Sequence, residues 1–395
     1  MKHNIRRTAD EVFAKLPKLP ADIGAKILHL THSDLDGEGA AMALSMLPYD
    51  IEVRRLTNNN MSYEIGKVFI TNESNNYDFI IVTDISCSKK VCDIINKHPD
   101  AKKLIILDHH QTSDYLNDYP FGVCQSVILS DSVMTEEYRC YFDRKDKLSE
   151  FETADLHSSG TSLMVDYLWY HKLFEVLPTK KVDLFKVFAN YVRCYDTWDW
   201  KLCFDGNAYI APCPLFNTLY DAYGANNFSR KIFRNMYQTL RRPASEMDDM
   251  FGFDESDILY DDDMFIIQCE QDKMAQFVES VKEHVRTGNL VISDEMNETK
   301  YYSVAYISCN RYLQEVFDMM KENYADTDIY IINYGSGLSF RVIREDINIG
   351  QLVTLWGGGG HPGAAGVKIP GELMDNLVCN DVLTGKLILN EKEKE

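Results

Sequence analysis

Basic residues are scarce in this sequence. Its 41 lysines and arginines face 61 aspartates and glutamates, which gives a formal net charge of −20. A protein that coats long nucleic acid binds many phosphates through cationic side chains, so this balance argues against that class. A short phosphorylated ligand held locally by a metal ion remains compatible with the charge.

Long apolar runs and closely spaced cysteines are also missing. No apolar stretch approaches the ~20 residues that a membrane span needs, so we expect no membrane association. The segment Met1–Arg7 is basic but has no apolar segment behind it. We therefore expect no secretory signal and a cytoplasmic protein. The 10 cysteines include no Cys-x-x-Cys pair, which favours reduced thiols over a zinc knuckle or a disulfide framework.

A chain of 395 residues exceeds the usual size of one core, so two domains are the default. We expect a catalytic α/β domain over 1–225, with a polar surface insertion at about 131–156. A helical and acidic connector is expected over 226–263, because Glu246–Asp263 contains nine acids and no bases. A smaller α/β domain, beginning with a strand, is expected over 264–395.

Short apolar runs alternate with helical segments in the first 110 residues. The runs that read as buried strands are Lys26–Leu30, Ile51–Leu56, Asp78–Val82 and Leu104–Leu107. Alternation of strand and helix predicts a parallel, doubly wound sheet. The carboxyl ends of such strands share one edge of the sheet, where open α/β sheets bind their ligands.

Acids and imidazoles follow three of these strands at that edge. They are His32, Asp34 and Asp36 after the first run, Asp84 after the third, and Asp108, His109 and His110 after the fourth. Carboxylates that converge on one point repel one another unless a cation is present. Oxygen and imidazole ligands suit manganese or magnesium better than a metal that prefers thiolates. Taken singly, these motifs also fit a helix cap or a turn with surface histidines.

Three other segments leave a structural and a functional interpretation open. Ser158–Ser162 precedes a helix. The segment either caps this helix or binds a phosphate at the amino terminus of the helix. Asp196 lies beside Trp198 and Trp200, which either pack it into a cleft or belong to the core. The basic helix expected at Asn227–Leu240 is more often a solvated face than a phosphate contact.

A glycine-rich segment, Gly357–Gly366, lies near the end of the chain. Four consecutive glycines are costly to order, so a chain keeps them where the backbone must approach something closely. Their amides would form an anion-binding nest, with His361 directly after them and Arg341 on the preceding strand. A flexible hinge is the alternative, against which the rigid Pro362 argues.

Together these segments resemble the DHH phosphoesterase superfamily in its form with a DHHA1 carboxyl-terminal domain. The matching motifs run from about residue 26 to 369 and are His32–Gly37, Asp84, Asp108–His110, Asp196 and Gly357–Gly366, with Arg341 upstream. The resemblance implies an active-site cleft between a DHH domain and a DHHA1 domain. The first motif is most similar to that of the nanoRNase B group of oligoribonucleases. In pyrophosphatase-like members, the histidine of the first motif lies four residues before the first aspartate. In this sequence Leu30 occupies that position and His32 lies two residues before Asp34, which disfavours a pyrophosphatase.

The resemblance implies a two-metal site, for which we expect Mn²⁺, with Mg²⁺ or Co²⁺ as alternatives. The implied metal ligands are His32, Asp34, Asp36, Asp84, His109 and Asp196, with Asp84 contacting both ions. Asp108 would orient an imidazole, and His110 would act at the scissile phosphate. The implied substrate-binding residues are Arg341, Gly357, Gly358, Gly359, Gly360 and His361.

The activity that follows from the resemblance is hydrolysis of short oligoribonucleotides to mononucleotides by two-metal activation of water. A phosphodiesterase or phosphatase of small signalling nucleotides, such as cyclic or linear dinucleotides or 3′-phosphoadenosine-5′-phosphate, uses the same residues and is the alternative. A nucleotide-binding regulator with a dead site is disfavoured, because no expected metal ligand is missing. The expected partner is thus a short RNA or a small nucleotide. The sequence is compatible with a homodimer but does not fix the oligomeric state.

Overall fold

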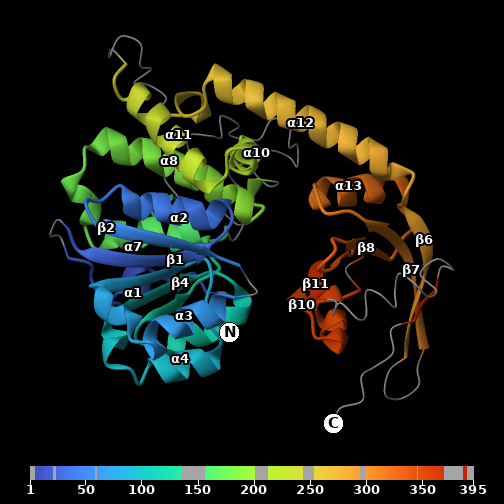
Figure 1. Cartoon of the computed structure of the whole chain (residues 1–395), viewed down its shortest axis with the longest axis horizontal. Helices are drawn as coiled ribbons and strands as arrows, with labels where there is room; N and C mark the ends of the chain where they lie inside the picture. Colours follow the sequence, from blue (N-terminus) through green and yellow to red (C-terminus); the bar gives the residue numbers. More distant parts are fainter. Residues whose placement is uncertain are drawn as a thin grey trace. The chain divides into compact units, whose positions relative to one another are not determined.

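The structure is a computed structural model that describes residues 5–20, 24–57, 60–134, 156–200, 212–242, 253–293, 299–344, 346–368 and 386–388. The chain forms two compact units, residues 1–268 and 269–395 (Figure 1). In the part of the chain that the structure describes, no helix is both long and apolar enough to cross a bilayer.

The first unit is built on a parallel sheet with the strand order β2-β1-β3-β4-β5. The strands are β1 Lys26–His32, β2 Asp50–Leu56, β3 Phe79–Thr83, β4 Leu104–Asp108 and β5 Gly122–Cys124. Strand β1 pairs with β2 on one side and with β3 on the other, so the winding of the chain reverses there. This confirms the predicted doubly wound sheet and creates the kind of crevice in which such sheets bind ligands.

Helices cover both faces of this sheet (Figure 1). One face carries α1 Ala9–Phe13, α2 Leu35–Ser45, α7 Gly160–Tyr170, α8 Thr179–Asp196, α10 Cys213–Tyr223 and α11 Ala225–Thr239. The other face carries α3 Met61–Ile70 and α4 Lys89–Ile95. Short 3₁₀ turns connect these elements at Glu73–Asn76, Pro99–Lys103, Gln111–Asp118, Leu173–Val176 and Glu255–Asp257.

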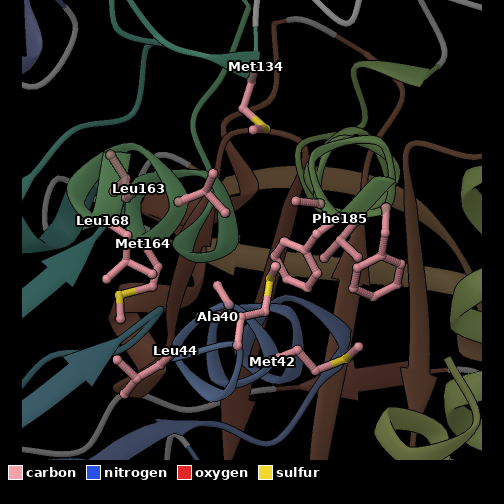
Figure 2. Close-up of a cluster of buried hydrophobic side chains, with 14 of the residues drawn as sticks. Ala40, Met42, Leu44, Met134, Leu163, Met164, Leu168 and Phe185 are labelled. Atoms are coloured by element: carbon pink, nitrogen blue, oxygen red, sulfur yellow. The ribbon is translucent and has the colours of Figure 1, made fainter. Parts of the chain in front are cut away.

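The alternation of side chains along β4 divides the core into two layers. Ile105 and Leu107 belong to the cluster under α2, α7 and α8, whereas Leu104 and Ile106 belong to the cluster under α3 and α4. Figure 2 shows the first cluster, in which side chains of α2, α7 and α8 interdigitate. Because both faces are covered, the central strands β3 and β4 are almost entirely apolar, and their polar residues stand where these strands end.

The second unit contains a mixed sheet, in the order β10-β11-β9-β8-β7-β6-β12. Its strands are β6 Arg286–Ser293, β7 Thr299–Ser308, β8 Ile329–Asn333, β9 Gly337–Arg341, β10 Gly359–His361, β11 Ala364–Lys368 and β12 Lys386–Ile388. Its helical segments are α13 Leu313–Asn323, α14 Ile349–Leu352 and a 3₁₀ turn at Val353–Trp356. The predicted α/β class of the second domain is therefore confirmed.

The strand expected at Met264–Cys269 is wrong, because this stretch lies in the helix α12, Asp261–Lys282. Three aspartates occupy the first turn of α12, where the helix dipole stabilises acids. Asp263 is buried there and accepts a hydrogen bond from Asn235 Nδ2 at 2.7 Å. A six-residue apolar run does not distinguish a strand from a helix by itself, which explains the error.

The predicted insertion and connector lie partly outside the described residues. Of the insertion at about 131–156, residues 135–155 are not described, and of the connector at 226–263, residues 243–252 are not described. The described part of the connector belongs to the first compact unit, and the two units divide between Gln268 and Cys269, inside α12.

Candidate metal centre

The sequence-predicted acids and histidines of the first unit gather at the carboxyl edge of its sheet. His32 ends β1, Asp34 caps α2, and Asp36 lies in the first turn of that helix. Asp84 directly follows β3, and Asp108 is the last residue of β4. These positions follow from the sheet, since the ends of parallel strands lie side by side.

Three overlapping groups of these side chains are each compact enough to hold a metal ion. In each group the ligand atoms lie within 4.8 Å of one another. The groups are His32 with Asp34 and Asp84, Asp36 with His109 and Asp196, and Asp84 with His109 and His110. Asp196, which ends α8 rather than a strand, joins the same cluster. All six expected ligand residues thus belong to these overlapping groups.

Asp84 belongs to two of these three groups. Its Oδ1 lies 3.1 Å from His109 Nε2, and its Oδ2 lies 3.6 Å from His32 Nδ1. The backbone of Asp84 has a φ of 62°, in the left-handed region that residues other than glycine rarely adopt. Such strain persists only where the surroundings impose it, and here it directs the carboxylate into the cluster.

The amino terminus of α7 positions Asp36. The carboxylate of Asp36 accepts hydrogen bonds from the backbone nitrogen atoms of Gly160 at 2.6 Å and Thr161 at 2.9 Å. Ser159 caps the same helix, in a reciprocal capping box with Ser162. The Ser158–Ser162 segment therefore caps a helix, and two of its amides hold a side chain of the protein rather than a substrate phosphate.

Gly160 is required at the point where α7 meets the cluster. A Cβ atom at this position would lie 2.5 Å from Asp84 Cβ and 3.0 Å from Asp36 Oδ2. Any side chain here would displace the two carboxylates. This glycine was not among the predicted site residues, because its contacts are 76 and 124 positions away in the chain.

Asp108 acts on the two histidines that follow it. Its Oδ1 accepts hydrogen bonds from the backbone nitrogen atoms of His109 at 2.8 Å and His110 at 3.2 Å. The same oxygen lies 2.8 Å from His110 Nδ1. Asp108 is 1% exposed and the His110 side chain 44% exposed. The pair thus directs the second ring nitrogen of His110 away from the buried carboxylate.

Mutual repulsion and burial disturb the titration of these groups. Burial, together with Asp34 and Asp36, raises the pKa of Asp84 well above its usual value. Burial and Asp36 raise the pKa of Asp196 to about 7. Burial lowers the pKa of His32, but Asp34 and Asp84 outweigh it and raise that pKa to about 10. Without a cation nearby, these carboxyl groups therefore hold their protons more tightly than isolated carboxyl groups do.

The residues present fit divalent metal ions. Asp84 Oδ2 and Asp196 Oδ2 are buried and have no hydrogen-bond partner among the described residues. Buried oxygen atoms without a partner are unfavourable, and a cation would satisfy them. The donors are carboxylate oxygens and imidazole nitrogens, which suit Mn²⁺ and Mg²⁺.

Two polar features near the cluster were missed from the sequence. His29 is fully buried in β1, and its Nε2 lies 2.8 Å from Thr83 Oγ1. Burial lowers the pKa of His29 to about 3, so this side chain stays neutral and supports the strand ends. Asp199 is buried and pairs with Arg193 and His157. No local pattern signals this trio, because His157 is 42 residues from Asp199.

In the second unit the glycine-rich segment forms a tight hairpin rather than an open nest. Strand β10 pairs with β11, and His361 and Arg341 are both register partners of Ala364. The amides of Gly357 and Gly358 donate to the carbonyls of Thr354 and Val353, so these two amides are not available to an anion.

The glycines of this hairpin have a steric role. A Cβ atom at Gly358 would lie 2.4 Å from the carbonyl oxygen of Gly366, and one at Gly360 would lie 2.4 Å from that of Ala364. On the neighbouring strand, Arg341 Nη1 donates to Ser339 Oγ at 2.8 Å and to the Phe340 carbonyl at 2.9 Å. Its Nε is buried and has no hydrogen-bond partner among the described residues.

Comparisons with known proteins give one relative by sequence and several by fold. No family model matches the chain. The chain is 24% identical over 357 residues to oligoribonuclease NrnB of Bacillus subtilis, which covers 88% of this chain and 74% of that protein. Exonuclease RecJ bound to manganese is 14% identical with a TM-score of 0.45, over 93% of this chain and 94% of that one. The pGpG-specific phosphodiesterase PggH of Vibrio cholerae is 12% identical with a TM-score of 0.39, over 90% and 96%. With TM-scores below 0.5, these two structures carry no weight for the function.

Proposed function

We propose that the chain is a member of the DHH phosphoesterase superfamily and that it hydrolyses short oligoribonucleotides to mononucleotides with the help of two divalent metal ions. The observation that carries this proposal is the position of Asp84 between two groups of metal-ligating side chains. The similarity to an oligoribonuclease over 88% of the chain supports the choice of substrate.

The proposed ligands of one ion are His32, Asp34 and Asp84, and those of the other are Asp36, His109 and Asp196, with Asp84 shared. When bound, such ions lower the pKa of a water molecule toward neutrality and neutralise charge that develops on phosphoryl oxygens. Mn²⁺ is the ion that we expect, with Mg²⁺ or Co²⁺ as substitutes.

The surrounding residues would hold the substrate and the ligands in place. Gly160 and Thr161 fix the carboxylate of Asp36 through their amides, so this ligand is held before an ion binds. Asp108 fixes Nδ1 of His110, which leaves the other ring nitrogen to donate to an oxygen of the scissile phosphate. Pre-positioned donors of this kind stabilise charge in the transition state.

The substrate is proposed to be short because the chain offers little for a long one. With a net charge of −20, a long phosphate backbone would be repelled, whereas a few phosphates can be held by metal ions and single donors. In the second unit, we propose Arg341 as one such donor, through its buried Nε. His361 and the glycines Gly357–Gly360 are proposed to line the same part of the substrate site.

A product time course with Mn²⁺ tests this proposal. The substrates would be a 5′-labelled RNA dinucleotide, a pentamer and a 24-mer, beside linear and cyclic diadenylate and 3′-phosphoadenosine-5′-phosphate. Faster hydrolysis of the dinucleotide and the pentamer than of the 24-mer is the expected result. Preference for the cyclic dinucleotide or the bisphosphate would overturn the proposal in favour of a signalling-nucleotide phosphodiesterase. Bound metal without turnover of any substrate would indicate a nucleotide-binding regulator.

A further inference from the structure

Three fully buried polar side chains connect strands β1 and β3 to helix α2 through a hydrogen-bond relay. His29 and Thr31 are in β1, and Thr83 is the last residue of β3. His29 Nε2 lies 2.8 Å from Thr83 Oγ1, and Thr83 Oγ1 lies 2.8 Å from Thr31 Oγ1. Thr31 Oγ1 lies 2.9 Å from the carbonyl oxygen of Gly37, which is in the first turn of α2. The relay therefore runs from His29 to the start of this helix.

Only one arrangement of hydrogen atoms satisfies all three contacts of the relay. The Gly37 carbonyl can only accept, so the hydroxyl of Thr31 must donate to it. Thr31 has no second hydroxyl hydrogen, so the contact between the two threonines requires Thr83 to donate. The contact between His29 and Thr83 then requires the Nε2–H group of His29 as the donor. The other acceptor near Thr31 Oγ1, the carbonyl oxygen of Thr83, is farther away, at 3.3 Å.

This arrangement makes the other ring nitrogen of His29 a buried acceptor. Burial keeps the ring neutral, because it lowers the pKa of His29 to about 3. Nδ1 has no hydrogen-bond partner among the described residues. A buried polar atom without a partner is unfavourable, whereas an apolar side chain of similar size would fill the same space without that cost. Packing alone does not explain an imidazole at this position, but its role as a donor to Thr83 does.

Both ends of the relay are next to proposed metal ligands. Thr83 directly precedes Asp84, whose backbone has a φ of 62°. Gly37 directly follows Asp36, and its amide donates to Asp34 Oδ1 at 3.0 Å. The relay thus connects the strand end that carries one carboxylate to the helical turn that carries the other two.

The first turn of α2 is packed closely on its neighbours. A Cβ atom at Gly37 would lie 2.2 Å from the carbonyl oxygen of His32, so the turn touches the end of β1. The hydroxyl of Thr161 donates to the carbonyl oxygen of Asp36 at 2.6 Å. Because close-packed interiors transmit strain, a small shift of the hydrogen-bond partners of this turn reaches the carboxylates that it carries.

We propose that His29 is a positioning residue of the metal centre, which fixes the first turn of α2 relative to Asp84 through the hydroxyl groups of Thr83 and Thr31. The ring donates to a threonine rather than to a ligand, so its effect on the ions is indirect. Outer hydrogen-bond partners of metal ligands typically change metal affinity by roughly 10–100-fold. This inference rests on the proposed function, because it concerns the same metal ions.

Mn²⁺ binding to the full chain, measured by isothermal titration calorimetry, tests the inference. Thr83→Val keeps the shape of the side chain but removes the hydroxyl, and His29→Leu removes the donor. Each substitution should raise the dissociation constant of Mn²⁺ about tenfold or more. Thr83→Ser keeps a hydroxyl, and His29→Gln offers an amide N–H group. These two variants should stay within about threefold of the wild-type dissociation constant.

A matched control is Thr239→Val in α11. Thr239 is also fully buried, and its Oγ1 donates to the carbonyl of Asp257 at 2.6 Å and lies 2.7 Å from the hydroxyl of Tyr260. This variant should melt at a lower temperature than the wild type but bind Mn²⁺ equally well. Melting temperatures of all metal-free variants separate loss of folding from loss of binding.

Two results would overturn the inference. One is wild-type affinity for Mn²⁺ in both Thr83→Val and His29→Leu. The other is a loss of affinity in these two variants that is no greater than the loss in Thr239→Val, because that would be an effect of lower stability alone.

Failure of the proposed function would look different. A wild type that binds Mn²⁺ but hydrolyses no RNA would refute the proposed activity, and the comparison of affinities would still decide the role of His29. If the wild type binds no Mn²⁺, crystal structures of the metal-free wild type and Thr83→Val replace the titration. A shift of about 1 Å or more at Asp84 or the first turn of α2, a scale that disrupts a site, would support the positioning of the carboxylates by the relay. Superimposable positions would refute it.

Discussion

Asp84 Oδ1 lies 3.1 Å from Nε2 of His109, across the carboxyl ends of two neighbouring strands. The other oxygen of the same carboxylate faces His32, at 3.6 Å. This side chain therefore belongs to two of the three ligand groups, the one with His32 and Asp34 and the one with His109 and His110. This relationship underlies the proposed two-metal hydrolysis and the predictions that follow from it.

Asp84→Asn should remove the proposed shared ligand while keeping the backbone, since asparagine tolerates a φ of 62° better than most residues. We expect a loss of at least about a hundredfold in kcat, the scale of one electrostatic group in a catalytic site. The metal-free variant should melt at a higher temperature than the wild type, because a buried carboxylate beside Asp34 and Asp36 is lost. Kinetics and thermal unfolding check both points, and wild-type turnover in the variant would remove Asp84 from the proposed metal site.

Gly160→Ala should damage the site through shape alone. The added Cβ atom would lie 2.5 Å from Asp84 Cβ, a separation that forces α7 or the carboxylates to move. We expect a loss of about 1–3 kcal/mol in the free energy of unfolding, together with weaker binding of Mn²⁺. The control is Gly66→Ala in α3. The added Cβ atom would lie 3.1 Å from its nearest neighbour, Val91 Cγ1, and alanine has a higher helix propensity than glycine. Equal effects of the two substitutions on Mn²⁺ affinity would contradict this account.

Arg341→Ala should mainly raise KM. The buried Nε has no partner among the described residues, so a ligand phosphate would supply one. We expect KM for a short RNA to rise about tenfold or more, with a smaller change in kcat. A contact that is equally strong in the bound substrate and in the transition state affects KM rather than kcat. Arg341→Lys retains the charge but loses the forked geometry and should recover only part of the affinity. A fall in kcat at constant KM would instead assign Arg341 to the chemical step.

Asp166→Asn should change how stability depends on pH. Burial raises the pKa of Asp166 to about 7, although Ser132 and the backbone of Val133 donate to it. The native state therefore binds a proton that the unfolded state releases near pH 4, and stability falls as pH rises from about 4 to about 7.

The Asp166→Asn variant should match the wild type near pH 4 and exceed it above pH 7. The difference is at most about 4 kcal/mol, because burial raises the pKa of Asp166 from 3.8 to about 7. Denaturant unfolding at several pH values measures this difference. The exposed Asp118, replaced by asparagine, serves as the control. A constant difference across this range would show that Asp166 does not titrate as proposed.

Much of the first unit was predictable because its signals are local. An apolar run that ends in Asp108-His109-His110 specifies both a buried strand and the edge at which its polar residues lie. The same reasoning placed His32 and Asp84 at neighbouring strand ends. Asp196 was expected only from the resemblance, since it ends a helix rather than a strand.

The parts that escaped prediction depend on contacts between distant segments. The hydrogen bond from the Gly160 amide to the Asp36 carboxylate joins residues 124 positions apart, so no short sequence pattern reveals it. The pairing of Asp199 with His157 is likewise invisible until α7 and α8 are packed. The start of α12, which lies in the first unit, was mistaken for a strand because a short run rich in apolar residues does not distinguish a helix from a strand.

The most direct test of the two-metal claim is a crystal structure with Mn²⁺, measured at the manganese absorption edge. The account predicts two anomalous peaks. One would be bounded by His32, Asp34 and Asp84, and the other by Asp36, His109 and Asp196, with a carboxylate oxygen of Asp84 facing each. A single peak, or two peaks of which neither contacts Asp84, would contradict the account.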